Sequence, residues 1–234
     1  MGESRASLIL FARSPVAGAV KTRLAAALGA EGAARLYRAF LEDAARVYGS
    51  GDWSPALYAE SDPDDPELAL LFGPPWRREA QVEGNLGRRL AEAFRAERSR
   101  GAPAVVAVGS DHPALHRSAL TRLLEAVAVA GGDDAAFVPA GDGGYCAVGL
   151  SARVEPEAVF DGIPWSSETT LAATLDRLRD RRFSVTLLEP ANDVDRPADL
   201  DRLRADLAAR SPDEDDYPRA TAAALAAITA ALSA

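Results

Sequence analysis

The sequence predicts an α/β fold with one mostly parallel sheet that is covered by helices on both faces. Residues 7–12 and 104–109 are apolar at almost every position, as buried parallel strands are. Segments with helical periodicity separate such runs, and this alternation is typical of parallel sheets. The length of 234 residues suffices for one sizeable core, and no Gly-, Ser- or Pro-rich stretch divides the chain.

The other elements are expected from the same two patterns. Further strands are predicted at residues 56–59, 135–139, 145–150 and 183–188. Helical patterning begins at Thr22 and resumes over residues 31–48. Further helices are predicted at residues 84–98, 117–130, 166–180, 197–209 and 221–234. We expect residues 1–210 to form the domain, and residues 211–234 to form an acidic linker and an Ala-rich helix packed on it.

Composition argues against several classes of partner. Lys and Arg total 26 against 35 Asp and Glu, and a net charge of −9 is unfavourable for binding nucleic acid or anionic membranes. One cysteine, Cys146, and two histidines exclude a disulfide framework and a Cys-rich zinc site. No apolar stretch is long enough for a signal sequence or a membrane span, so we expect a cytoplasmic protein.

A basic loop follows the first strand. It carries Arg13, Lys21 and Arg23, and Lys21 is the only lysine of the chain. The loop matches neither the GxGxxG nor the Walker A pattern, but cations beside a helix N-terminus are suited to binding a phosphate or diphosphate. Together with Gly18 they are the candidate phosphate-binding residues. We expect Lys21 and Arg23 to contact phosphate rather than carboxylates; the alternative is a solvated basic loop.

Two aspartates that follow strands are the candidate metal ligands. Asp111 follows the strand at 104–109, and Asp195 follows the strand at 183–188. Each has a structural alternative as a helix cap, since Pro113 and Pro197 come shortly after them. Carboxylates from two adjacent strand ends would suit Mg²⁺ or Mn²⁺ bound to substrate phosphates. We therefore predict a shared metal site.

A glycine-rich turn is the candidate substrate or acceptor site. Asp142, Gly143, Gly144 and Tyr145 offer a carboxylate, an aromatic ring and room for close approach, although a simple hairpin turn is the alternative. Trp165 fits either the core or a stacking surface. We expect Ser166 to cap the next helix. Pro113 interrupts any zinc-binding pairing of His112 with His116, and Cys146 is expected in the core.

Five of these segments together resemble a known pattern: residues 10–24, 109–113, 139–145, 163–169 and 193–200. In this order they are similar to a largely uncharacterised, glycosyltransferase-like bacterial family of the GT-A superfamily, which has the nucleotide-diphospho-sugar transferase fold. More distantly they resemble phospholactate guanylyltransferases and molybdopterin nucleotidyltransferases. The resemblance spans about residues 7–205. It implies a GT-A, Rossmann-like domain in which Lys21 and Arg23 hold nucleotide phosphates, and Asp111 and Asp195 hold the metal.

The chain departs from the resembled pattern at three places. Arg13 stands where Lys is usual, Gly141 stands where Glu is usual, and Ser110-Asp111 lacks the Asp-x-Asp of many GT-A glycosyltransferases. We expect a metal-dependent transferase with Lys21, Arg23, Asp111 and Asp142 as its catalytic residues.

Three functions remain open for this chain. The first is glycosyl transfer from a nucleotide-diphospho-sugar to a small-molecule acceptor. The alternative is nucleotidyl transfer to a small phosphorylated acceptor with release of pyrophosphate. The third, which Gly141 keeps open, is an inert nucleotide-binding protein. One fold hosts both reactions and the motif chemistry does not choose between them, but the resemblance to a glycosyltransferase-like family favours glycosyl transfer slightly. The sequence indicates no oligomeric state.

Overall fold

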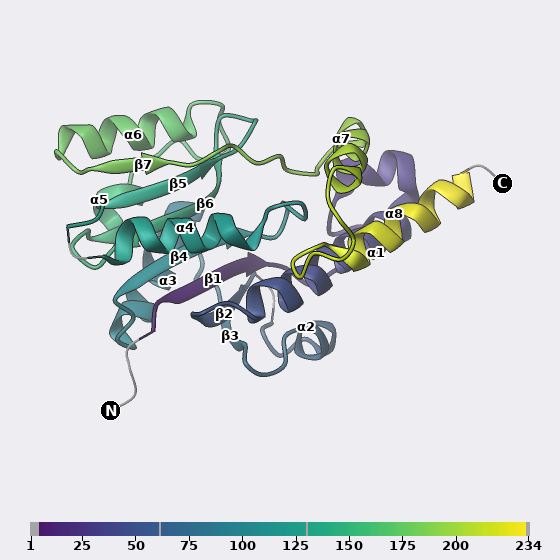
Figure 1. The fold of residues 1–234 in the computed structure, drawn as a ribbon, viewed down its shortest axis with the longest axis horizontal. Helices are drawn as coiled ribbons and strands as arrows, with labels where there is room; N and C mark the ends of the chain where they lie inside the picture. Colours follow the sequence, from purple (N-terminus) through teal and green to yellow (C-terminus); the bar gives the residue numbers. More distant parts are fainter. Residues whose placement is uncertain (1–4, 61, 130, 233–234) are drawn as a thin grey trace.

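Seven strands in the described part of the chain form one sheet (Figure 1). The computed structural model describes residues 5–60, 62–129 and 131–232. The strands are β1 (Ser7–Ala12), β2 (Ser54–Ala59), β3 (Arg77–Ala80), β4 (Ala104–Gly109), β5 (Ala135–Pro139), β6 (Tyr145–Ser151) and β7 (Val185–Leu187). Their order across the sheet is β3-β2-β1-β4-β6-β5-β7. Every pairing is parallel except those of β6, which runs antiparallel to both β4 and β5. The predicted mostly parallel α/β sheet is confirmed.

Helices cover both faces of this sheet, as predicted. They are α1 (Thr22–Gly49), α2 (Pro66–Leu71), α3 (Leu86–Ser99), α4 (Arg117–Ala128), α5 (Pro156–Phe160), α6 (Thr170–Asp180), α7 (Pro197–Ala208) and α8 (Arg219–Leu232). Within α1, Gly29 has φ 71° and interrupts the helix, which agrees with the expected break before residue 31. In the described residues, no helix combines the length and apolarity that crossing a membrane requires.

The alternation of side chains along β1 divides the core into two layers. Leu8 and Leu10 face the layer that contains the buried residues of α1, α4, α7 and α8. Ile9 faces the opposite layer, which is formed with α3, α5 and α6. Because β1 is buried on both faces, its sequence is continuously apolar rather than alternating.

Several elements differ from the sequence expectation. The edge strand β3 was not predicted because its sequence, Arg-Arg-Glu-Ala, has no apolar periodicity. The short helices α2 and α5 were missed as well. Strand β7 is three residues long rather than six, and α6 begins at Thr170 rather than at Ser166. The expected helix ends at Ala130 and Ala234 lie outside the described residues.

A buried carboxylate in α1 holds the last helix against the domain. Helix α8 packs on α1, and the Asp43 side chain accepts hydrogen bonds from the Ala220 N–H (3.1 Å) and the Thr221 N–H (2.7 Å). These amides belong to the first turn of α8, where four N–H groups have no partner within the helix. Asp43 therefore caps α8 from another helix and complements its dipole.

We expect Asp43→Ala to lower the free energy of unfolding by about 2 kcal/mol, the upper part of the range for losing a helix cap. Hydrogen exchange should show the amides of α8 losing protection before the rest of the chain. Glu42→Ala is the matched control, because Glu42 is exposed and pairs only with Arg38 in the described structure. Equal effects of the two substitutions would contradict this role of Asp43.

Candidate active site

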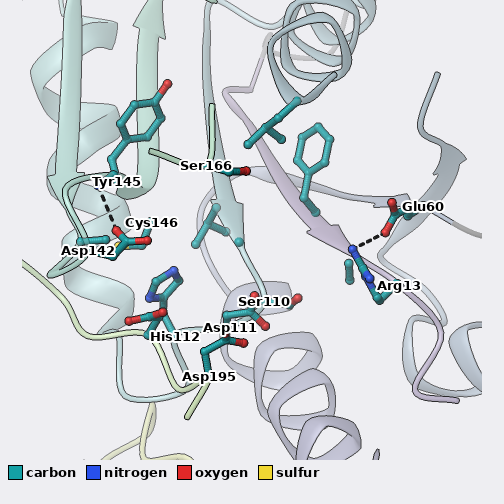
Figure 2. A pocket seen from close by; sticks show the side chains of 18 of the residues that line it. Arg13, Glu60, Ser110, Asp111, His112, Asp142, Tyr145, Cys146, Ser166 and Asp195 are labelled. Carbon is teal, nitrogen blue, oxygen red and sulfur yellow. Dashed lines mark hydrogen bonds and ion pairs between the residues drawn. The ribbon is translucent and has the colours of Figure 1, made fainter. Parts of the chain in front are cut away.

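A cavity of about 660 Å³ opens beyond the carboxyl ends of β1 and β4 (Figure 2). Ligand pockets usually measure roughly 300–1,000 Å³, and in open α/β sheets they lie at this edge. Its lining includes most of the predicted site residues: Arg13, Lys21, Arg23, Asp111, Asp142, Gly144, Tyr145, Trp165 and Asp195. Gly18 and Gly143 do not line it. One pocket thus brings together residues that are far apart in the sequence.

Lys21 lies at the centre of the charged end of this pocket. Its ammonium is 2.6 Å from Asp111 Oδ1 and 3.6 Å from Asp195 Oδ1. The contact with Asp111 is an ion pair rather than an aligned hydrogen bond, since Nζ has no partner in hydrogen-bond geometry. Arg23 Nη1 donates to the other oxygen of Asp195 at 2.7 Å. The contacts seen for both cations are therefore with carboxylates, and their contact with phosphate stays a prediction.

The local backbone and two aromatic rings place this ammonium. Lys21 has the left-handed conformation, φ 47° and ψ 42°, directly before the first residue of α1. The side chain is 3% exposed, and its Nζ lies 5.9 Å from the ring centroids of both Tyr37 and Phe40. Rings at this distance attract a cation through their quadrupole. A buried, fixed positive charge therefore faces the pocket.

Tyr37 also connects the two strand ends that bear the site. Its hydroxyl bonds with Ser110 Oγ at 2.8 Å and accepts the Arg13 N–H at 3.3 Å. Burial, together with the negative charge of Asp111, raises the pKa of Tyr37 to about 12, so the phenol stays protonated at neutral pH. The loops after β1 and β4 are thereby held at a constant spacing.

Asp111 is not a helix cap. Helix α4 begins only at Arg117, six residues further along the chain, and its first N–H bonds to Asp216. The Asp111 side chain is 49% exposed and faces the pocket. The structure therefore removes the capping alternative for this residue.

Asp195 reaches Asp111 by a path that the sequence did not indicate. We expected adjacent strands, and this was wrong: β6 and β5 stand between β4 and β7 in the sheet. The segment after β7 instead crosses the end of the sheet towards α7 (Figure 1), and the Val194 N–H donates to the Asp111 carbonyl at 3.0 Å. Asp199 accepts the N–H groups of Asp195 and Arg196, so the carboxylate of Asp195 is not used as a cap.

Arg13 lies apart from the other two cations. Figure 2 shows it pointing to Glu60 across the pocket from Asp111 and Asp195, and its Nη2 is 2.5 Å from Glu60 Oε2. Glu60 also accepts from Arg89 at 2.9 Å. The basic loop therefore divides between two ends of the pocket. Sequence reasoning missed three residues that line the Arg13 end: Glu60 after β2, Gln81 after the unpredicted strand β3, and Arg89 in the first turn of α3.

The glycine-rich turn joins β5 to β6, so it is a hairpin connection that also lines the pocket. Asp142 Oδ1 accepts the Gly144 N–H at 2.9 Å. Gly143 has φ 86°, and a Cβ there would lie 2.0 Å from the Glu168 carbonyl oxygen, so only glycine fits. The Gly143 carbonyl accepts the Leu171 N–H of α6. This hydrogen bond connects the turn to the first residues of α6. The Asp142 side chain remains exposed at the pocket.

Aromatic side chains form the wall next to this turn. Tyr145 packs against Phe137 and Trp165, with ring centroids 5.0 and 6.1 Å apart. Tyr145 and Trp165 also line the pocket. Trp165 therefore has both of the positions considered for it, since it packs against the core and also forms part of the cavity wall. The expected cap at Ser166 was wrong: Ser166 has φ 60°, lies four residues before α6, and lines the pocket.

The remaining polar groups near the pocket do not form a second site. His112 is buried in the lining, and burial holds its pKa below the ordinary value. Cys146 is buried with its Sγ directed at the Val138 carbonyl, as a core residue. Elsewhere in the described residues, His116, Glu214 and Asp216 lie close enough to hold a metal ion. Arg210 pairs with both of those carboxylates and offsets one of their two negative charges.

The Asp111 and Asp195 pair has the donor chemistry for a hard divalent cation. One oxygen of each carboxylate faces the same positive charge, the Lys21 ammonium. Carboxylates are the ligands that Mg²⁺ and Mn²⁺ prefer, and such ions take their remaining ligands from water and substrate phosphates. The residues present therefore fit the predicted ion.

Solved structures of other proteins share this fold. A structure from Desulfovibrio desulfuricans G20, described as a candidate nucleotide-diphospho-sugar transferase, has 31% identity and a TM-score of 0.82 over 95% of this chain and 97% of that one. A nucleotidyl transferase from Methanothermobacter has 16% identity and a TM-score of 0.61, covering 89% and 100%. No curated protein sequence matches significantly.

A third neighbour carries ligands. The glucosyl-3-phosphoglycerate synthase of Mycobacterium tuberculosis, in complex with Mn²⁺, UDP and glucosyl-3-phosphoglycerate, has 13% identity and a TM-score of 0.50, covering 96% of this chain and 80% of that one. At such identities the second and third neighbours share the fold alone. The family described as "Uncharacterized protein conserved in bacteria (DUF2064)" matches residues 43–167, more than half of the chain. The chain therefore belongs to the DUF2064 family and has the nucleotide-diphospho-sugar transferase fold.

Proposed function

We propose that this protein is a metal-dependent transferase that takes its donor as a nucleotide-diphospho-sugar and transfers the sugar to a small acceptor. The observation that supports this most is the meeting of Lys21, Arg23, Asp111 and Asp195 at one end of a 660 Å³ pocket. Two cations and two carboxylates at the carboxyl end of a parallel sheet suit the phosphates of a nucleotide and the ion that accompanies them.

Each residue has a role in this proposal. Lys21 and Arg23 bind the diphosphate and stabilise the charge that develops on it as the bond to the sugar breaks. Asp111 and Asp195 hold Mg²⁺ or Mn²⁺, which would neutralise the same leaving group. The buried position of Lys21 supports its role, since a fixed charge in a poorly solvated site needs little reorganisation during the reaction.

The wall of the pocket formed by the β5–β6 turn suits the acceptor. Asp142 is exposed there and is the candidate for orienting or deprotonating the acceptor hydroxyl. Gly143 and Gly144 set the shape of its turn. Tyr145 and Trp165 give an apolar wall of the kind on which sugar rings pack. This wall beyond the charged cluster is what favours sugar transfer.

Nucleotidyl transfer to a phosphorylated acceptor is the second candidate. It is favoured by the segment that ends β4, which reads Gly109-Ser110-Asp111 and therefore lacks at this place the Asp-x-Asp of many GT-A glycosyltransferases. Nucleotidyltransferases are also among the proteins of the same fold. Both reactions would use the same cations. They differ in the atom that the acceptor attacks, which is the anomeric carbon in sugar transfer and the α-phosphorus in nucleotidyl transfer.

The products distinguish the two reactions. The protein is incubated with Mn²⁺ or Mg²⁺, a panel of acceptors, and either nucleotide sugars or nucleoside triphosphates. We expect acceptor-dependent release of a nucleoside diphosphate from a sugar donor, and its loss in Asp111→Asn. Pyrophosphate from a triphosphate, with no diphosphate from any sugar donor, would instead establish nucleotidyl transfer. Nucleotide binding with neither product would point to the inert binding protein.

A further inference from the structure

The Lys21 ammonium stands where the proposed divalent cation would bind. It is within 3.6 Å of one carboxylate oxygen from each of Asp111 and Asp195, and its side chain is almost completely buried. A hard cation that used the same two oxygens would lie within a few ångströms of this ammonium. Two positive charges at such a separation repel each other, and burial of the Lys21 side chain leaves little water to screen the ammonium. The ammonium and the ion therefore cannot both occupy this position.

The charges of the cluster balance without any ion. Asp111 and Asp195 contribute two negative charges, and Lys21 and Arg23 contribute two positive ones. Arg23 occupies Oδ2 of Asp195, which leaves Oδ1 facing Lys21. Adding a divalent cation alone would leave an excess of positive charge, whereas an ion that arrives with a diphosphate would not. Phosphate oxygens would also offer the ammonium a new partner.

We propose that Lys21 acts as an internal competitor of the divalent cation, and that nucleotide phosphates relieve this competition by drawing its ammonium off Asp111 and Asp195. Binding of the ion and of the phosphates is then coupled, and each strengthens the other. This inference rests on the proposed function, because it uses the same pocket and ligands. It adds that Lys21 weakens ion binding in the nucleotide-free protein while it strengthens nucleotide binding.

The test is a titration of the purified protein with Mn²⁺ alone, in which electron paramagnetic resonance reports the free ion at 0.15 M salt. Lys21→Gln should bind Mn²⁺ at least about 10-fold more tightly than the wild type, within the roughly 5- to 150-fold range of typical coupling between sites. Adding Asp111→Asn to Lys21→Gln should abolish the gain. This second variant separates the proposed site from the cluster at His116, which it leaves intact.

Arg13→Gln is the matched control, because it removes one positive charge from the same pocket at the end paired with Glu60. Its Mn²⁺ affinity should stay within about 3-fold of the wild type, since Arg13 pairs with Glu60 rather than with Asp111 or Asp195 in the described structure and salt screens charges that are not in contact. An equal gain in both single variants would mean a general charge effect and would overturn the inference.

Two further outcomes keep this inference separate from the proposed function. If Lys21→Gln shows no gain while Mn²⁺ still binds through Asp111 in the presence of UDP or GDP, the competition is wrong and the metal site stands. If Mn²⁺ binds through Asp111 in none of the variants, with or without nucleotide, both the competition and the metal role are wrong. Circular dichroism and a thermal melt establish that each variant is folded.

Discussion

Replacing Asp195 with Asn is expected to lower metal-dependent turnover by about 100-fold or more, which corresponds to roughly 2.7 kcal/mol of transition-state stabilisation. The amide keeps the shape of the side chain but removes the charge that faces Lys21 and Arg23. A neutral oxygen is a weak ligand for Mg²⁺ or Mn²⁺, and the cations lose the partner that positions them. Asp111→Asn should behave similarly, because Asp111 supplies the other carboxylate that faces Lys21.

Calorimetry with a nucleotide in the presence and absence of Mn²⁺ measures the binding part of this effect. We expect both variants to lose the dependence of nucleotide affinity on the ion while their thermal stability changes little. Asp201→Asn makes the same chemical change on α7 at an exposed side chain that pairs with Arg204, and it should behave as the wild type. Unchanged ion and nucleotide affinity in both site variants would refute the shared metal site.

The second large effect concerns stability. Glu97→Gln is expected to lower the free energy of unfolding by about 3 kcal/mol, the lower end of the range for breaking a buried ion pair. The Glu97 side chain is 1% exposed, and it accepts from Ser7 Oγ (2.6 Å), Tyr58 Oη (2.9 Å) and the Arg77 guanidinium. Arg100 also lies near it. We expect a loss at the lower end of the range for buried ion pairs because the side chains of Arg77 and Arg100 are partly exposed to water.

The pH dependence of stability gives a second readout for Glu97. Burial would raise its pKa, but hydrogen bonds from Arg77, Ser7 and Tyr58 outweigh burial and hold the pKa below the ordinary value of 4.5. A lowered pKa in the folded state means that this contribution is present above the unfolded pKa and is lost as the pH falls below it. The difference in stability between wild type and Glu97→Gln should therefore stay constant from pH 7 down to the neighbourhood of the unfolded pKa of 4.5, and narrow as the pH falls from there through the lower folded pKa.

Urea denaturation at several pH values measures both effects, and the melting temperature at pH 7 should fall by about 6–12 °C for a chain of this size. Glu79→Gln is the matched control: Glu79 pairs with the same two arginines, Arg77 and Arg100, but it is one-third exposed. Its loss should cost less than about 1 kcal/mol, as surface ion pairs do. Equal costs for Glu97→Gln and Glu79→Gln would show that burial of the carboxylate is not decisive.

Much of the architecture could be predicted from the sequence because the signals for it are local. Buried strands such as β1 and β4 are continuously apolar, and helices such as α3 repeat their apolar residues every three to four positions. Ligand sites in such sheets lie beyond the carboxyl ends of the strands, and this rule pointed to Lys21 and Asp111 as site residues. Both residues line the pocket. Strand β3 was missed because an edge strand with charged residues has no such periodicity.

What the tertiary structure alone decided is which side chains meet. Arg23 and Asp195 are 172 positions apart, and no local pattern indicates that they pair. Asp195 approaches Asp111 because the segment after β7 crosses two intervening strands, and Arg13 pairs with Glu60 because β1 and β2 are neighbours. The physical reason is that periodicity depends on the nearest few residues, whereas ion pairs depend on the path of the whole chain. The burial of Lys21 between two carboxylates, on which its chemistry depends, follows from that path.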